Sequence, residues 1–84
     1  MKYYMYILQS SIGSYYIGAT NNIYERVNQH NKGRVKSTKS YRPWKLIYNE
    51  SYSTLSEARK REVKVKGWKS RKAIEKLLAL SSNG

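Results

Sequence analysis

The sequence contains no cysteine, no aspartate and no phenylalanine, and it has one proline and one histidine. Without cysteine, the chain can form neither a disulfide framework nor a zinc site held by thiolates. Without aspartate, its acidic side chains are five glutamates, too few to build a cage of several carboxylates around two metal ions. Disulfide scaffolds, thiolate zinc modules and two-metal chemistry are therefore not expected.

Long apolar runs are also missing. The stretch MKYYMYILQSS offers one lysine and then only a few apolar residues before Gln9, which is too short for the hydrophobic region of a signal peptide. No other run approaches the length that spans a bilayer. We therefore expect a soluble, cytoplasmic domain without a membrane-spanning segment.

Negative charge is scarce as well. Seventeen Lys and Arg stand against the five glutamates, which gives a formal net charge of +12. Solubility alone suggests a net charge of only about 2–8 for a small domain. The excess indicates a partner that carries phosphate, with nucleic acid as the first expectation and an anionic membrane surface as the second.

The length of 84 residues predicts a single domain over residues 1–84, with two layers of secondary structure. Runs rich in Tyr and Ile at 3–8 and 14–19 flank a Ser/Gly cluster, as the strands of a β-hairpin do. After Pro43, residues 44–52 alternate as a third strand would.

Capping residues predict where the helices begin. An Asn or Thr that is followed three residues later by Glu is typical of a helix start, and a Gly of a helix end. The predicted helices run from Asn22 to about Gly33, from Thr54 to about Gly67, and from Ser70 onward, with residues 2–78 ordered and 81–84 frayed. The expected fold is therefore α+β, a three-stranded β-sheet with helices packed against it in the order β-β-α-β-α-α.

Two charged side chains, Arg26 on the first helix and Glu62 on the second, are predicted on the helix faces that pack against the sheet. At about 100° per residue, Arg26 and His30 lie within about a third of the helix circumference with the apolar Ile23 and Val27. A charged arginine on a packing face needs a partner. The alternative is an Arg26 side chain that extends out of the seam, with its charge on tyrosine hydroxyls.

Glu62 repeats this pattern on the second helix. It lies in the apolar stripe of Leu55, Ala58 and Val65, where a carboxylate must be paired, hydrogen-bonded or bound to metal. One carboxylate with waters and a substrate phosphate is a common way to hold Mg²⁺. An ordinary ion pair between Glu62 and Arg26 is the alternative. The other glutamates are expected at helix caps, a strand end and an exposed helix side: Glu25, Glu57, Glu50 and Glu75.

The sequence contains nine tyrosines, and their strand register and neighbouring residues indicate which of them could act in a site. Tyr6 and Tyr16 point to the same side of the hairpin if its turn has an odd number of residues. Tyr41 and Trp44 border a basic loop over residues 32–42, where they could stack on bases. A solvated loop is the alternative reading. The basic residues expected to contact phosphates are Arg34, Lys36, Lys39, Arg42 and Lys66.

In chain order, the motifs YMYIL, YYIGAT, ERVNQHN and EARKREVKVKGW resemble a GIY-YIG nuclease domain. The similarity covers about residues 2–78 and is greatest to the small stand-alone bacterial members, which are related to the N-terminal module of an excision-repair nuclease and to phage homing endonucleases. The chain differs at Tyr4, which replaces a glycine of the first motif. It also differs at Ala19, which stands where the excision-repair module has a lysine.

The resemblance implies a site and a reaction. Its catalytic residues would be Tyr6, Tyr16, Arg26, His30 and Glu62, with Glu62 holding Mg²⁺ or Mn²⁺. The reaction would be hydrolysis of a phosphodiester in DNA by one metal ion, with Arg26 on the scissile phosphate. The base is either Tyr16, helped by Tyr6, or His30, whose reference pKa of about 6.5 suits the role.

Other functions remain open on the residues alone. A nucleic-acid-binding module of the same fold, without useful catalysis, would share the charge and the fold. RNA is an alternative substrate to DNA, and a protein partner could supply specificity. A membrane-surface or protein-interaction domain would need a sustained basic amphipathic helix. Segment 59–72 is basic, but its apolar face is narrow and interrupted by Glu62.

Overall fold

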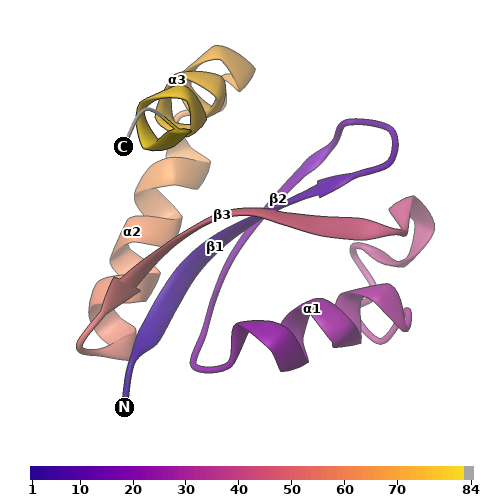
Figure 1. Ribbon diagram of the computed structural model, residues 1–84, viewed down its shortest axis with the longest axis horizontal. Coiled ribbons are helices and arrows are strands. Elements are labelled where there is room, and N and C mark those ends of the chain that lie inside the picture. The colour runs from indigo at the N-terminus through magenta and orange to yellow at the C-terminus, as the bar shows by residue number, and fades with distance from the viewer. Residues whose placement is uncertain (83–84) are drawn as a thin grey trace.

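The computed structural model describes residues 1–82 and forms an α+β fold (Figure 1). Its elements follow the predicted order β-β-α-β-α-α, with one 3₁₀ turn before the last strand. They are β1 (Tyr3–Ser10), β2 (Tyr15–Thr20), α1 (Ile23–Asn31), η1 (Lys39–Tyr41), β3 (Trp44–Tyr52), α2 (Leu55–Gly67) and α3 (Arg71–Ser82). The fold class expected from the sequence is confirmed.

The sheet has the strand order β2-β1-β3, and both neighbouring pairs are antiparallel. In the hairpin, Tyr6 pairs with Gly18 and Leu8 with Tyr16. Ser10 and Ser14 close the turn through a 2.9 Å backbone hydrogen bond, so three residues form the loop. The third of them, Gly13, has φ +86, a left-handed conformation that suits glycine in such turns. This odd number places the Tyr6 and Tyr16 side chains on one face of the sheet.

The two faces of the sheet carry separate cores, because side chains alternate along each strand. One face presents Tyr6 and Leu8 of β1, which pack with Trp44 and with Val27 of α1. The opposite face presents a larger core under α2 and α3, formed by Met5, Ile7, Ile17, Val65 and Ile74. Figure 1 shows α1 on one side of the sheet and α2 with α3 on the other. The expectation of two layers is therefore wrong: the short sheet is covered on both faces.

The predicted caps start the first two helices. Asn22 Oδ1 accepts a hydrogen bond from the Glu25 amide at 3.1 Å, and Thr54 Oγ1 accepts one from the Glu57 amide at 3.2 Å. These bonds satisfy amide groups that have no partner inside the helix.

The end of α1 is fixed by backbone bonds that turn the chain into the basic loop. The amides of Gly33 and Arg34 donate to the carbonyls of His30 and Gln29, and Gly33 has φ +76. This is the Schellman pattern of a helix end, which requires a left-handed residue.

The last helix begins where expected and runs further than expected. Ser70 Oγ accepts a hydrogen bond from the Ala73 amide at 3.3 Å. α3 continues to Ser82, so the first half of the predicted frayed tail is helical; the second half, 83–84, lies outside the described residues. No helix in the described part of the chain has the length and apolar character needed to cross a membrane.

Candidate active site

Tyr6 and Tyr16 lie side by side on the α1-covered face of the sheet. Their ring centroids are 6.3 Å apart, and Tyr6 is only 1% exposed whereas Tyr16 is partly buried. Gly18 pairs with Tyr6 across the hairpin, and a Cβ at position 18 would lie 2.5 Å from the Tyr6 hydroxyl. The glycine therefore leaves the space that the Tyr6 ring occupies.

His30 is fully buried behind Tyr6 and takes part in two hydrogen bonds. Its Nε2 lies 3.1 Å from the Tyr6 hydroxyl, and its Nδ1 lies 2.8 Å from Thr38 Oγ1. The Thr38 hydroxyl donates to the Val35 carbonyl at 3.3 Å, so it can only accept from His30. We therefore assign the proton of the imidazole to Nδ1, and Tyr6 donates to Nε2.

The ionisation of His30 and Tyr6 is set by this burial. Burial, and then the charge of Arg26, lower the pKa of His30 to about 4, so the imidazole is neutral at pH 7. Burial raises the pKa of Tyr6 to about 12, against the opposing hydrogen bond from Arg26. At neutral pH both groups keep the protonation states that their hydrogen bond requires.

Arg26 lies on α1, one turn before His30, and faces both tyrosines. Burial lowers its pKa, but hydrogen bonds and charge interactions with Tyr6 and Tyr16 outweigh that effect and raise it overall. A further bond at 2.8 Å runs from Nη1 to Gln29 Oε1. The guanidinium is thus held between α1 and the tyrosine pair, with part of its surface free to meet an anion.

Glu62 reaches the same place from α2. Its charge raises the pKa of Tyr6, and its Oε2 lies 2.6 Å from the Lys66 ammonium. Lys66 in turn lies 5.9 Å from the centroid of the Tyr16 ring. Among the described residues the ion pair of Glu62 is with Lys66 and not with Arg26, the pair that the sequence had left open. Leu55, predicted in the packed stripe of this helix, is exposed instead.

The donors around Glu62 fit only one kind of metal site. No group of three or more His, Cys, Asp or Glu side chains that could hold a metal occurs within residues 1–82. Glu62 supplies one carboxylate, with a side chain 21% exposed. Mg²⁺ and Mn²⁺ are compatible with such a site, because they accept one carboxylate together with waters and phosphate oxygens.

A second network, which the sequence did not reveal, ties α2 to the sheet. Arg61 makes two hydrogen bonds to Glu50 of β3, at 2.9 and 3.2 Å, and both neighbouring tyrosine hydroxyls also donate to Glu50. Despite burial, the bonds from Arg61, Tyr48 and Tyr52 lower the pKa of Glu50. The alternation of Tyr48, Glu50 and Tyr52 along one strand face was the available signal. Because Arg61 precedes Glu62, the network fixes the rotation of the helix that carries Glu62.

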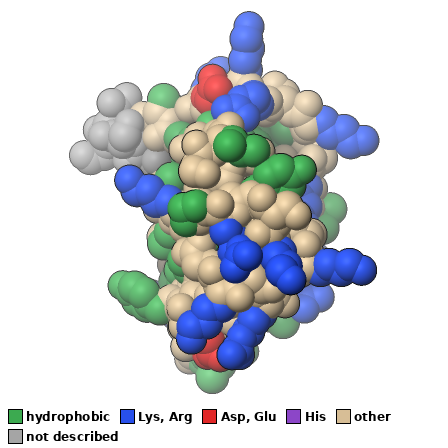
Figure 2. All heavy atoms as spheres, turned by 90° about the vertical axis from the view of Figure 1, so that its right-hand side faces the viewer, with side chains coloured by type: hydrophobic (Ala, Val, Ile, Leu, Met, Phe, Trp, Pro, Cys, Tyr) green, Lys and Arg blue, Asp and Glu red, His purple; other side chains and the backbone are tan. Residues whose placement is uncertain are grey.

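The predicted basic loop lies beside α1 and contains η1. Figure 2 views this side of the molecule, where Lys and Arg side chains project from many places on the surface and acidic side chains are few. Tyr41 is 47% exposed, but Trp44 is only 5% exposed and donates from Nε1 to the Thr38 carbonyl at 2.9 Å. The expectation that Trp44 stacks on bases is therefore wrong. The four loop cations predicted to contact phosphates are all exposed: Arg34, Lys36, Lys39 and Arg42.

Three comparisons bear on this arrangement. The model of the GIY-YIG catalytic domain matches residues 2–76. A UPF0213 protein of Staphylococcus saprophyticus is 40% identical over 75 residues, which cover 88% of this chain and 92% of the relative. One from Staphylococcus epidermidis is 44% identical over 66 residues, or 77% and 80% of the two chains. The solution structure of a UPF0213 protein from Bacillus halodurans is similar with a TM-score of 0.61 and 33% identity, over 95% of this chain and 85% of that one.

Proposed function

Because the chain belongs to the GIY-YIG catalytic domain family, we propose that it is a metal-dependent endonuclease that hydrolyses phosphodiester bonds in DNA. Membership implies nuclease activity in general, together with nucleic-acid binding and the use of a divalent metal. The observation that carries the finer proposal is the convergence of Tyr6, Tyr16, Arg26 and Glu62 from four different elements. In this proposal the two hydroxyls, the guanidinium and the carboxylate act together on one phosphate of the substrate.

Arg26 would bind the non-bridging oxygens of the scissile phosphate. Its planar donors match two phosphate oxygens at once, and its charge opposes the negative charge that develops in the transition state. The tyrosine pair already holds the guanidinium in place, so the side chain of Arg26 loses little conformational entropy when the phosphate binds.

Glu62 would hold one Mg²⁺ or Mn²⁺. When bound there, the metal supplies stabilisation of the charge on the leaving oxygen. In the metal-free protein Lys66 neutralises the carboxylate. A metal at Glu62 would take the place of Lys66, whose ammonium would then be available to a phosphate of the substrate.

Tyr16 is the better candidate for the base that accepts a proton from the attacking water. His30 has no exposed surface, and both of its ring nitrogens are engaged by Tyr6 and Thr38. Tyr6 is buried and donates its proton to His30. Tyr16 is only partly buried and lies against Arg26 and Lys66. We therefore assign His30 a positioning role, in which it orients the Tyr6 hydroxyl toward Arg26.

The basic loop would hold the remainder of the substrate through its phosphates. Such contacts carry no sequence information, so a protein partner or the shape of the DNA would supply specificity. We propose DNA over RNA on the resemblance to repair and homing nucleases, and a cytoplasmic location with it.

The test is nicking of supercoiled DNA by purified protein with Mg²⁺ or Mn²⁺. Glu62→Gln and Arg26→Lys should each reduce the rate at least about 100-fold, because each removes an interaction with the reacting phosphate. Glu75→Gln, which alters an exposed glutamate on α3, is the matched control and should retain activity. Equal cleavage by the wild type and Glu62→Gln would leave only a binding module of this fold.

A further inference from the structure

A polar hollow of about 330 Å³ adjoins the candidate site, between α1, the end of β2 and α2. Arg26 of the proposed site forms part of its wall, and Arg59 of α2 forms the opposite part. The remaining lining residues are Ala19, Thr20, Asn21, Asn22, Glu25 and Gln29. The hollow therefore holds two cations, one anion and several uncharged donors.

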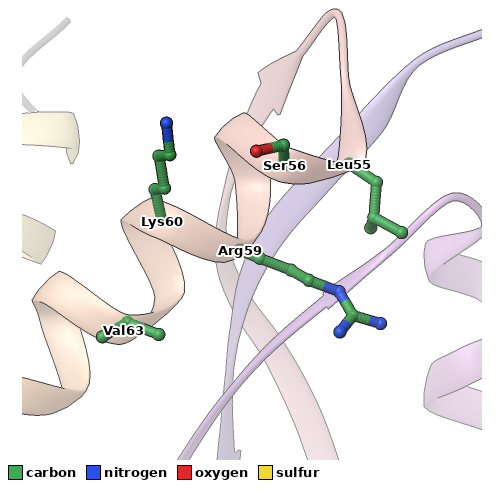
Figure 3. Close-up of a pocket in the computed structure, with 5 residues that line it drawn as sticks. All are labelled: Leu55, Ser56, Arg59, Lys60 and Val63. Atoms are coloured by element: carbon green, nitrogen blue, oxygen red, sulfur yellow. The ribbon is translucent and has the colours of Figure 1, made fainter.

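Arg59 belongs to the same side of α2 as the proposed metal ligand. It precedes Glu62 by three residues and Lys66 by seven, a spacing that places all three side chains along one helix face. The rise of an α-helix separates Arg59 from Glu62 by about 4.5 Å along the axis. Figure 3 is a close-up of a neighbouring pocket on α2 that Arg59 also lines; it shows the Arg59 side chain extending from α2 toward β2 and α1, whereas Lys60 points away from them.

Arg59 is also a cation without a partner among residues 1–82. Within the described part of the chain it makes no ion pair, hydrogen bond or ring contact, unlike Arg26, Arg61 and Arg71, which each have one. Its neighbour in the hollow, Glu25, is oriented toward Asn22 at the start of α1, with 3.5 Å between Oε2 and Nδ2. An exposed guanidinium that faces a second guanidinium across a polar hollow is a ready site for an anion.

We propose that this hollow binds a second phosphate of the substrate backbone, next to the phosphate that is cleaved, and that Arg59 is its principal ligand. The inference rests on the proposed function, because only a substrate with consecutive phosphates fills both positions. The stripe of Arg59, Glu62 and Lys66 then follows the backbone of one strand along the edge of β2. Glu25 lies in the same hollow and opposes the binding of this phosphate by like-charge repulsion.

The experiment compares two small probes whose binding needs no catalysis. Thymidine 5′-monophosphate carries one phosphate, and thymidine 3′,5′-bisphosphate carries two that are one nucleotide apart. Binding is followed by NMR of ¹⁵N-labelled protein, including the side-chain Nε–H signals of Arg26 and Arg59. The wild type should bind the bisphosphate about five- to tenfold more tightly, which corresponds to one added charge-assisted contact in a partly exposed site.

The variants separate a specific contact from the general attraction of a basic protein. Arg59→Gln should remove most of the preference for the bisphosphate. Lys60→Gln, which deletes the same charge from the neighbouring position, should keep it. Glu25→Gln retains the side-chain length and should strengthen binding of the bisphosphate, because the repulsive charge is gone.

Several results would overturn the inference: equal binding of the two probes by the wild type, no detectable binding of either, or an equal loss in Arg59→Gln and Lys60→Gln. Cleavage assays separate this outcome from failure of the proposed function. With nuclease activity established, Arg59→Gln should raise KM about fivefold at nearly unchanged kcat. If Glu62→Gln cleaved like the wild type, the nuclease proposal would fail, whereas the probe measurement would still report on the hollow.

Discussion

The Lys66 ammonium lies 2.6 Å from the Glu62 carboxylate, one turn earlier on α2, and also lies over the Tyr16 ring. The pair joins the proposed metal ligand to a proposed nucleic-acid contact. A cation that neutralises Glu62 competes with a divalent metal for the same oxygen atoms. Substrate and metal should therefore bind cooperatively, since each favours the open form of this pair.

Removal of Lys66 should strengthen metal binding. Lys66→Gln leaves Glu62 without its ion-pair partner, so Mn²⁺ affinity should rise about two- to fivefold, the range expected for a partly exposed pair. Titration calorimetry measures this, with Lys64→Gln on the exposed side of α2 as the control. DNA binding should weaken in the same variant. An unchanged or weaker Mn²⁺ affinity in Lys66→Gln would show that the pair does not compete with metal.

The buried imidazole of His30 should make stability depend on pH. Its pKa is about 4 in the folded protein and about 6.5 when unfolded, so the unfolded chain binds more protons between these values and stability falls as the pH falls. From pH 7 to pH 5 the loss should be about 2 kcal/mol. Urea unfolding measures it.

The matched variant for this effect is His30→Asn, which cannot titrate in that range. It should be less stable at pH 7, because Tyr6 and Thr38 lose their shared partner, and its stability should change little between pH 7 and pH 5. A slope as steep as that of the wild type would mean that another group is responsible.

Gly18 should tolerate no side chain. In Gly18→Ala the new Cβ would lie 2.5 Å from the Tyr6 hydroxyl, so the ring must move and stability should fall by about 1–3 kcal/mol. Nuclease activity should fall with it, since Tyr6 orients Arg26. The control is Gly67→Ala, where the added Cβ meets nothing within 4 Å and a helical glycine is replaced by a better helix former. Thermal unfolding measures both variants: the melting temperature of Gly18→Ala should fall, and that of Gly67→Ala should rise or stay the same.

The ion pair of Glu50 and Arg61 should contribute far more to stability than the exposed ion pair of Arg71 and Glu75 on α3. Glu50→Gln removes a half-buried charge that accepts bonds from Arg61, Tyr48 and Tyr52, and we expect a loss of about 1–3 kcal/mol. Glu75→Gln breaks a 3.8 Å pair whose side chains are both more than half exposed, and unfolding should hardly change.

Glu50 should add a second loss of stability as the pH falls. Because its pKa is lowered in the folded protein, the stabilisation is present above the carboxyl pKa of the unfolded chain and is lost as the pH falls through the folded value. Glu50→Gln should therefore reduce acid sensitivity below about pH 4.5, at the acid end of the range in which His30 acts. An unchanged acid transition would contradict this assignment.

Local sequence signals predicted much of the fold. Capping at Asn22 and Thr54 depends on residues three positions apart, which a sequence displays directly. The shared face of Tyr6 and Tyr16 follows from strand alternation once the turn has three residues. Helix periodicity placed Arg26 on the face of α1 that packs against the sheet, but its contact with the tyrosines was left open.

Other features of the fold and the site depend on tertiary packing, which the spacing of residues along the sequence does not show. Trp44 lies next to a basic loop in the sequence, yet its indole fills the core beneath α1 and bonds to Thr38. The role of Thr38 depends on how the loop folds back on His30, and no local pattern indicates it. Glu50 looked like a strand-end residue, and only the rotation of α2 brings Arg61 to it.

One metal ion bound at Glu62 should face Arg26 and the tyrosine pair. Adding Mn²⁺ to ¹⁵N-labelled protein tests this arrangement, because the paramagnetic ion broadens the signals of nearby groups. The Arg26 Nε–H and the backbone amides of Tyr16 and Glu62 should broaden first, and Glu62→Gln should abolish this selectivity. Broadening centred on Glu50 or Glu75, or the same pattern in Glu62→Gln, would contradict it.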